Sequence, residues 1–286
     1  MHPSLLLLTD SRLPAGGHAH SGGTERAVAS GAVHDVPSLR SFLRGRLHTA
    51  GALSAALTAA ACREAGRWGA VLADAARTHA THAEATHAEA SHAEASHAEA
   101  ALGAPRRRDV VRPGPAHVDG AQPTDTQAAP HPWVVLDAEV DARTASPAQR
   151  DASRTQGRLL LRVARRVWPS PVLDDLARLT PSPHHPIALG ATAHAAGATP
   201  EEAALAAAYH AITGPATAAV RLLGLDPVSV HALLADLTPD LTAVAAQACL
   251  PTIATPTWEA LPAHSAPALD LLAEQHARAQ IRLFIS

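Results

Sequence analysis

The chain has 286 residues, of which 47% are hydrophobic but only 2% aromatic, so alanine supplies much of the apolar content. Alanine has the highest helix propensity, whereas strands need bulkier residues, and the composition therefore predicts an all-α fold. A net charge of −3 gives no general attraction to nucleic acid or anionic membranes, and the absence of lysine excludes a lysine Schiff base.

A glycine-rich segment, residues 13–25, is predicted to be a recognition element near the start of the chain. Glycine permits positive φ and close backbone approach, and proline fixes φ before the turn. A carboxylate at the end of the segment falls in the first turn of an expected helix, where the helix dipole favours it. We expect the substitutions Gly17→Val and Gly23→Val to impair function severely, because a β-branched residue resists positive φ and pushes surfaces apart. The candidate partner-binding residues here are Pro14, Gly17, His20, Ser21, Gly23 and Glu25.

The same segment has two chemical alternatives. Residues 19–23 resemble a nucleophile elbow with Ser21 as the nucleophile of a hydrolase, but that elbow needs a preceding strand and a parallel sheet, which the sequence does not predict. His18 and His20 would need further ligands from elsewhere to hold a metal ion. A turn whose polar groups bond local backbone is the favoured interpretation.

A long helix is predicted from Pro37 to about Arg67, because apolar residues recur at steps of three and four. Gly66 is expected to end this helix. Cys62 and the distant Cys249 are expected to be small buried hydrophobic residues, with a shared metal or a disulfide as the less favoured alternative.

Residues 78–131 are interpreted as a low-complexity insertion, expected to be disordered, in a single domain spanning residues 1–286. Residues 79–101 repeat His-Ala-Glu-Ala-Ser/Thr, and residues 104–132 lack the apolar content that offsets chain ordering. On a helix a period of five turns successive histidines by about 140°, so they do not share a face. Repeat expansion without function is favoured over loose nickel or zinc binding. The weak metal-ligand candidates are His82, His87, His92 and His97.

The next helix is predicted to start at a capping box, Ser146-Pro147-Ala148-Gln149, and to continue to about Val167. In that box the Gln149 side chain reaches back to the cap. The helix region is rich in arginine, which is interpreted as a solvated face, with a protein interface as the alternative. These arginines are Arg143, Arg150, Arg154, Arg158, Arg162, Arg165 and Arg166.

The remaining helices are predicted from residues that cap a helix just before proline. One helix opens at Thr199 and is expected to stop at Gly214-Pro215, and a last helix runs from about Pro267 to Leu283. The pattern as a whole favours a compact bundle of roughly eight to ten helices. Other expected starts are His184-His185 before Pro186, Asp226-Pro227 and Thr238-Pro239.

Several function classes find no support in the sequence. It contains no phosphate-binding loop, no dinucleotide fingerprint and no Cys-x-x-Cys pair, so we expect no enzyme activity and no cofactor. No stretch reaches the roughly 20 apolar residues that a membrane span needs, and we expect a cytoplasmic protein that binds neither membranes nor nucleic acid.

Four blocks of the sequence, in order, resemble the UreF family of urease accessory proteins in its actinobacterial form. The first block, Leu-Thr-Asp-Ser-Arg-Leu-Pro-Ala-Gly-Gly-His-Ala-His-Ser-Gly-Gly-Thr-Glu, occupies residues 8–25. Residues 141–157 form the second, and residues 185–190 leading into 219–223 form the third. The fourth comprises residues 269–276 with 282–284. Together the blocks cover nearly the whole chain except the insertion.

The resemblance implies an all-α homodimer that binds UreD (also called UreH) and recruits the GTPase UreG to apo-urease, so that nickel is delivered to its active site. Two features depart from the family pattern, because other members often carry aromatic residues at His18 and His20 and because the repeat insertion is foreign to it. Further candidate partner-binding residues, which lie in the matching blocks, are Arg150, Arg221, His276, Arg282 and Phe284.

The competing hypothesis is a nickel-binding metallochaperone or storage protein in which the 19 histidines bind the metal. A storage protein should bind several nickel ions alone, whereas an adaptor should bind its partners after the repeat is removed.

Overall fold

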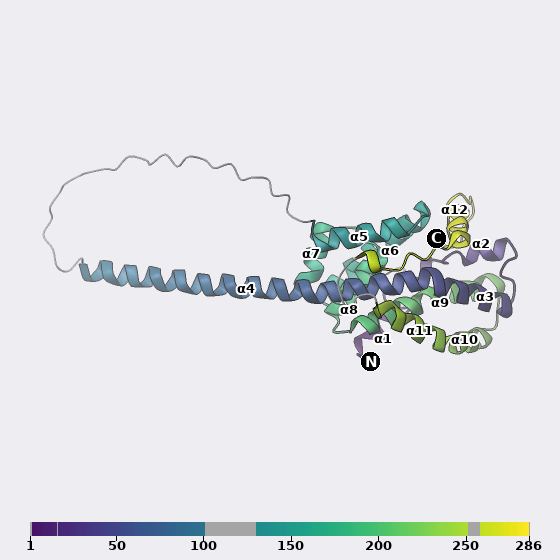
Figure 1. Ribbon diagram of the computed structural model, residues 1–286, viewed down its shortest axis with the longest axis horizontal. Coiled ribbons are helices and arrows are strands. Elements are labelled where there is room, and N and C mark those ends of the chain that lie inside the picture. The colour runs from purple at the N-terminus through teal and green to yellow at the C-terminus, as the bar shows by residue number, and fades with distance from the viewer. Residues whose placement is uncertain (1, 16, 101–129, 251–257, 286) are drawn as a thin grey trace. The chain divides into compact units, whose positions relative to one another are not determined.

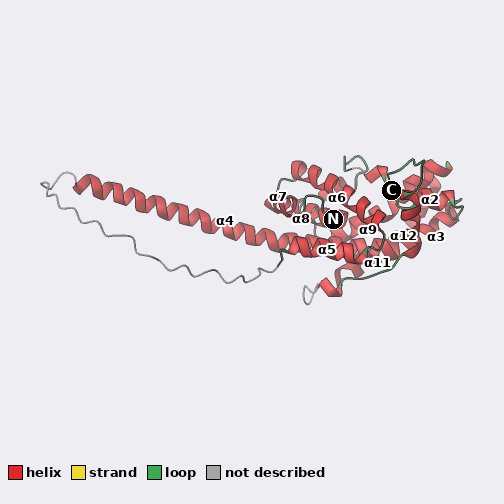
Figure 2. Cartoon of the chain, turned by 90° about the horizontal axis from the view of Figure 1, so that it is seen from above, coloured by secondary structure: helices red, strands yellow, loops and turns green. Residues whose placement is uncertain are grey.

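The computed structural model describes residues 2–15, 17–100, 130–250 and 258–285, with only the backbone described for residues 18, 83–100 and 259. All regular structure in these ranges is helical, as Figure 2 shows, which confirms the all-α prediction. Two compact units are distinguished, one formed by residues 1–69 and 131–286 and the other by residues 70–130. The helices are α1 Ser4–Thr9, α2 Thr24–Ala29, α3 Val36–Arg46, α4 Ala52–Ala100, α5 Pro132–Arg143, α6 Pro147–Val167, α7 Pro171–Leu179, α8 His185–Ala195, α9 Pro200–Leu223, α10 Pro227–Asp236, α11 Thr238–Cys249 and α12 Pro267–Ala277.

Helix α9 lies at the centre of the first unit and contacts α1, α2, α3, α8, α10 and α11 (Figure 1). The predicted capping box at its start is confirmed, because the Thr199 side chain accepts from the Glu202 backbone N–H and the Glu202 carboxylate accepts from that of Thr199. Most of its buried residues are alanines, which let neighbouring helices approach closely. The small side chains therefore explain how a core with so few aromatic residues is packed.

The prediction that this helix stops at Gly214-Pro215 is wrong, because α9 continues through Pro215 to Leu223. A proline inside a helix lacks the N–H that would bond the carbonyl four residues earlier. Here Arg46 supplies that hydrogen, since its Nε donates to the Ala211 carbonyl at 2.8 Å. The side chain of α3 thus replaces the missing backbone hydrogen bond, which the local sequence of α9 does not reveal.

The helix predicted over residues 37–67 is also divided and extended. A π-helical turn, Leu47–Gly51, separates α3 from α4, and α4 does not end at Gly66. Gly66 instead packs against the His194 ring, 3.5 Å from where a Cβ would stand. Gly66 therefore allows close packing against α8 and does not end the helix.

The cysteines and the helix contacts near them agree with a tightly packed core. Cys62 and Cys249 are both buried and unbridged, and burial raises the pKa of the Cys62 thiol to about 12. A Cβ at Gly190 of α8 would stand 2.8 Å from the Cys62 backbone nitrogen, so only glycine permits this approach of α8 to α4. The expectation of small buried hydrophobic residues is confirmed.

The backbone of the histidine repeat is helical as far as Ala100, where α4 ends. His82 is exposed, and the side chains of His87, His92 and His97 lie outside the described residues, as do residues 101–129. The first unit resumes at His131, whose ring meets the Trp68 ring edge-on at 4.4 Å.

The last helix ends at Ala277 and not near Leu283 as predicted. Residues 278–285 leave the helical path because their backbone bonds the N-terminal region instead, as described below. Across the described part of the chain, no helix is both long and apolar enough to cross a membrane.

Candidate protein-binding site

The glycine-rich segment forms a turn fixed by glycine conformation and by α3 and α9. Gly22 and Gly23 have φ values of 60° and 91°, in the region that favours glycine. The Arg46 guanidinium donates from Nη1 to the Gly22 carbonyl at 2.8 Å, while its Nε bonds α9. Burial lowers the pKa of Arg46 to about 10, a value at which it still carries its charge at neutral pH. One partly buried cation therefore holds the turn, α3 and the proline-containing part of α9 together.

The turn and the C-terminal segment are joined by Glu25 at the start of α2. Its carboxylate accepts from the backbone N–H of Leu283 at 2.8 Å and from that of Phe284 at 3.2 Å. The Ile285 N–H donates to the Ala19 carbonyl at 2.7 Å. We call this set of contacts between residues 19–25 and 276–285 the terminal junction.

His276 of α12 also contributes to the terminal junction. Its ring is buried, with Nε2 lying 3.2 Å from the Phe284 carbonyl and Nδ1 lying 3.6 Å from the Glu25 carboxylate. Phe284 is also buried, at 9% exposure. Phe284 is therefore packed into the first unit, and the C-terminal segment is fixed at three successive backbone positions.

Beside the buried Phe284, the same segment exposes large apolar side chains. Ile281 is 89% exposed, Leu283 77% and Ile285 59%. Leu283 and Ile285 therefore stand exposed on either side of the buried Phe284. Leu271 of α12 is likewise exposed, at 62%. Grouped exposed side chains of this size are typical of protein-binding surfaces.

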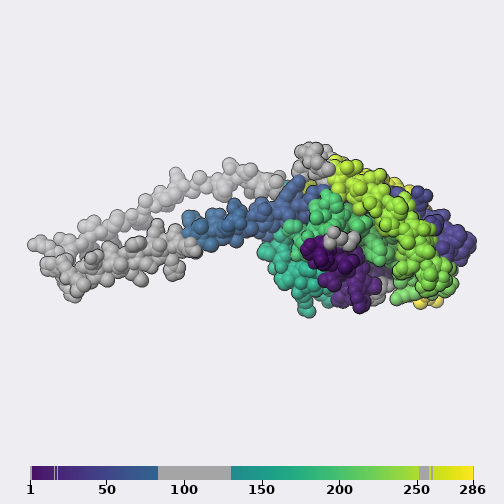
Figure 3. Space-filling model, turned by 90° about the horizontal axis from the view of Figure 1, so that it is seen from below, coloured from purple at the N-terminus to yellow at the C-terminus, as the bar shows by residue number. Residues whose placement is uncertain are grey.

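A cavity of about 920 Å³ adjoins the terminal junction and is lined by residues of the N-terminal turn, α6, α9 and α12. Figure 3 shows the N-terminal segment in purple packed on the surface of the molecule.

Two histidines that line this cavity have lowered pKa values. Burial, with the nearby rings of His210 and His20, lowers the pKa of His185 to about 3. Burial also lowers that of His210 to about 4, against the opposing effect of its hydrogen bond to the Leu8 backbone. Both rings are neutral at physiological pH.

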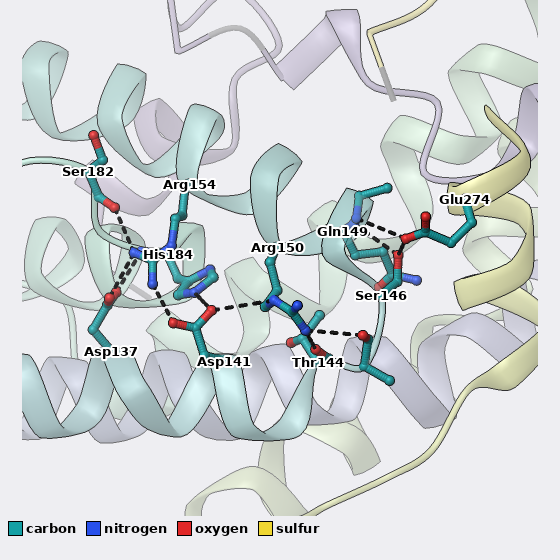
Figure 4. A network of polar contacts seen from close by, with 12 residues as sticks. Asp137, Asp141, Thr144, Ser146, Gln149, Arg150, Arg154, Ser182, His184 and Glu274 are labelled. Atoms are coloured by element: carbon teal, nitrogen blue, oxygen red, sulfur yellow. Dashed lines mark hydrogen bonds and ion pairs between the residues drawn. The ribbon is translucent and has the colours of Figure 1, made fainter. Parts of the chain in front are cut away.

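A polar network connects α5, α6 and α8 (Figure 4). Arg154 of α6 donates to Asp137 at 2.9 Å and to Asp141 at 2.5 Å, both on α5, and to the Ser182 carbonyl at 3.0 Å. His184 donates its backbone N–H to Asp137 at 2.8 Å, and its Nε2 lies 2.9 Å from the Asp141 carboxylate. The network therefore fixes the start of α8 against α5 and α6.

Asp137, Asp141 and His184 lie close enough together to suggest a metal site, because one ligand atom of each falls within 4.8 Å of the others. The guanidinium of Arg154, however, bonds both carboxylates and supplies the positive charge that a cation would. Burial lowers the pKa of His184, which keeps the ring neutral. The cluster is better described as an ion-paired network within the fold.

A second polar contact links the start of α6 to α12 (Figure 4). Ser146 caps α6 by accepting from the Gln149 N–H at 3.2 Å, as predicted. The predicted return contact from Gln149 is wrong, because its amide donates to Asp270 of α12 at 3.1 Å. Glu274 of α12 instead accepts from the Ser146 hydroxyl at 2.6 Å and from the Ala148 N–H at 3.0 Å. Helix α12, far away in the sequence, thus completes the cap of α6, and these contacts fix α12 against the start of α6.

The structure brings some predicted site residues together and separates others. Glu25, His276 and Phe284 meet in the terminal junction, with the exposed Arg282 beside them, and Gly23 packs against α12. Ser21 is buried and accepts from the Glu25 N–H at 3.5 Å, so it has no access to a substrate in this conformation. The residues outside this group are the exposed Pro14 and Arg221, and Arg150, which bonds the Thr144 carbonyl.

Gly17 does not need to be glycine on steric grounds. A Cβ at this position would meet nothing within 4 Å, and its φ is not positive. The expectation that valine at Gly17 is severe is therefore not supported, whereas the positive φ of Gly23 supports the same expectation there.

The sequence interpretation missed Asp137, Asp141, Arg154 and Glu274 as organising residues. Their partners lie on other helices, 13 to 128 positions away along the chain. Of these, only Arg154 carried a local signal, as one member of the arginine series.

The fold and the terminal junction define a helical bundle protein with a candidate protein-binding surface at the terminal junction. The UreF family model matches residues 108–238. Proteins named urease accessory protein UreF are 36% identical over 283 residues in Mycolicibacterium vanbaalenii and 37% identical over 287 residues in Mycobacterium sp. strain JLS, each alignment covering 99% of this chain and 98% of the relative. A relative of the same name from Mycobacterium marinum is 36% identical, with 99% and 97% coverage. The chain belongs to the UreF family.

Proposed function

We propose that the chain is a non-catalytic accessory protein of nickel-dependent urease maturation, which bridges UreD/UreH and the GTPase UreG on apo-urease. The relatives' name supports a role in urease maturation. The observation that carries the bridging role is the exposed apolar set of Ile281, Leu283 and Ile285 on a segment whose backbone is held in place. We assign this set to UreD/UreH binding.

The terminal junction supports this assignment because it prepares the segment for binding. A free chain end loses conformational entropy when it binds, which weakens the complex. Glu25 and His276 hold this end before any partner arrives. The exposed side chains therefore present a fixed surface at little further entropic cost.

Copurification with UreD/UreH tests the surface directly. The double variant Ile281→Ser, Leu283→Ser keeps Glu25 and the backbone contacts but removes two exposed apolar side chains. We expect at least a tenfold loss of UreD/UreH binding with the helical circular dichroism signal unchanged. The matched control is Val228→Ser, Leu250→Ser, two exposed apolar residues on α10 and after α11, which should bind normally. Equal binding by both double variants would contradict the assignment.

Removal of residues 279–286 is the stronger test of the same surface. It deletes the exposed set together with Phe284, and we expect UreD/UreH binding to be abolished while most helicity remains. If the truncated chain still binds at full strength, the interface lies elsewhere.

Deletion of the repeat separates the adaptor from the metallochaperone hypothesis. The deletion should end before His131, because that ring packs on Trp68 and lies 3.4 Å from the Asp175 carboxylate. We expect a chain without residues 79–130 to activate urease normally in cells that lack the native copy. Loss of activation at ordinary nickel supply, with the fold intact, would favour metal storage by the repeat.

A further inference from the structure

The second half of α6 and the adjoining α7 form an open groove of about 500 Å³, which we call the arginine groove. Its basic residues occupy one side of α6 and are all exposed. The residues that line it are Arg158, Leu161, Arg162, Arg165, Arg166, Asp174, Ala177 and Pro181. It shares no lining residue with the cavity beside the terminal junction.

The arginine groove has an excess of positive charge. Asp174 of α7 is its one acidic lining residue and lies 2.7 Å from Arg165. Among the residues that the structure describes, no carboxylate pairs with Arg158, Arg162 or Arg166. Three guanidinium groups therefore face solvent with their charge uncompensated by the fold.

These three cations are regularly spaced. Arg158, Arg162 and Arg166 are four residues apart on α6, and each step advances about 6 Å along the helix axis. In an extended peptide, side chains on one face repeat every two residues, or about 6.6 Å. Carboxylates at alternate positions of such a peptide would match the arginines almost one to one, each in the planar geometry that guanidinium and carboxylate share.

We propose that the arginine groove binds an acidic polypeptide segment of a partner protein, with carboxylates at alternate positions. The lining favours this ligand over a nucleotide or nucleic acid, because it offers no aromatic ring for base stacking and no glycine-rich loop for phosphate. Leu161, Ala177 and Pro181 supply apolar contacts for the stems of the peptide's side chains. The inference does not rest on the terminal junction or on the proposed function.

The test uses the full chain and a fluorescein-labelled peptide of four Glu-Ser repeats, followed by fluorescence anisotropy at low salt. The triple variant Arg158→Gln, Arg162→Gln, Arg166→Gln should bind at least tenfold more weakly than the native chain. A control with the same loss of charge replaces the exposed Arg67, Arg77 and Arg221 by Gln and should stay within twofold of native. The corresponding triple Lys variant keeps the charge without the planar fork and should bind at an intermediate level.

Two comparisons decide whether the ligand class is right. A Gln-Ser peptide should not bind, and neither inorganic phosphate nor a dodecamer of deoxythymidine should displace the Glu-Ser peptide at equal charge concentration. Equal binding by the native chain and the triple Gln variant would overturn the site. Tighter binding of the oligonucleotide or of phosphate would overturn the proposed ligand, and circular dichroism of each variant excludes unfolding as the cause.

Discussion

Arg154, in the first half of α6, is bonded to two carboxylates and a carbonyl, whereas Arg158 and Arg162, one and two turns further on, extend from an exposed face. The residue type, the helix and the spacing are the same in both halves. The neighbouring helix differs, because the first half faces Asp137 and Asp141 of α5, while the groove beside the second half has Asp174 as its one acidic lining residue.

This difference shows that a regular arginine series is not one structural feature. An arginine that pairs with a buried carboxylate contributes to stability, because removing it leaves that buried charge without a partner. An arginine that meets solvent contributes almost nothing to stability and keeps its hydrogen-bonding capacity for a partner. Gly157 lies between the two halves, where the backbone of residues 183–185 crosses α6.

The largest expected effect is that of Gly157→Ala, at the boundary between the two halves. The added Cβ would stand 2.8 Å from the carbonyl carbon of His184 and 2.9 Å from the His185 nitrogen, both backbone atoms that cannot rotate away. We expect a loss of about 3 kcal/mol in the free energy of unfolding, measured by urea denaturation. The control is Gly45→Ala in α3, where nothing lies within 4 Å and a gain of about 0.5 kcal/mol is expected from helix propensity.

Arg154→Gln tests the comparison itself. It leaves the buried Asp137 without its cation, and we expect a loss of about 2 kcal/mol in unfolding free energy, less than for a fully buried pair because Arg154 is partly exposed. Arg158→Gln, one turn along the same helix, should change stability by less than about 0.5 kcal/mol. Equal losses for the two variants would remove the distinction between the halves of α6.

The pH dependence of the unfolding free energy also distinguishes the two halves of α6, because titratable groups pack against the first half. Burial lowers the pKa of His184 below its ordinary 6.5, so protons bind the unfolded chain first and stability falls as the pH drops below that value. Burial opposes ionisation of Asp141, but its hydrogen bonds and charge contacts with His184 and Arg154 outweigh this and lower its pKa. Its contribution is complete above about pH 4, the ordinary value for aspartate, and is lost as the pH falls through the lowered pKa.

Unfolding free energies measured between pH 7 and pH 5 check the histidine contribution. His184→Gln should reduce the slope of stability against pH, whatever it does to stability at pH 7. Arg158→Gln, in the second half of α6, should leave the slope unchanged, because arginine does not titrate in this range. An unchanged slope in His184→Gln would show that other groups govern this pH range.

Much of the fold was predictable because helix starts are local. Ser146 and Thr199 cap their helices as their sequence neighbourhoods indicate, and the low aromatic content correctly predicts an all-α core. The errors occurred where a distant residue overrides a local signal. Pro215 is accommodated by Arg46, and Gln149 is displaced from its cap by Glu274, 128 positions from Ser146.

The candidate site was predictable only in part for the same reason. The glycine-rich segment and the apolar C-terminal end are each visible in the sequence, but nothing local shows that Glu25 bonds Leu283, 258 positions away. The arginine series is visible as well, yet its division into bonded and exposed members depends on α5 and α7. Contacts between elements therefore determined which local signals had a structural role.

Asp174→Asn should have only a small effect on stability, and it sharpens the contrast by making the second half of α6 more positive. The Arg165–Asp174 pair is exposed, and its loss together with that of the helix-dipole contact in α7 should cost only about 0.5 kcal/mol. Freed from this carboxylate, Arg165 adds a fourth unpaired cation to the arginine groove, so the Glu-Ser peptide should bind several-fold more tightly and with a steeper salt dependence. Asp151→Asn, at an exposed position of the first half of α6, removes the same charge and should leave peptide affinity unchanged. Equal gains in both variants would mean that the peptide responds to net charge and not to the groove. Weaker binding after Asp174→Asn would show that this carboxylate helps to order the arginines and does not compete with the ligand.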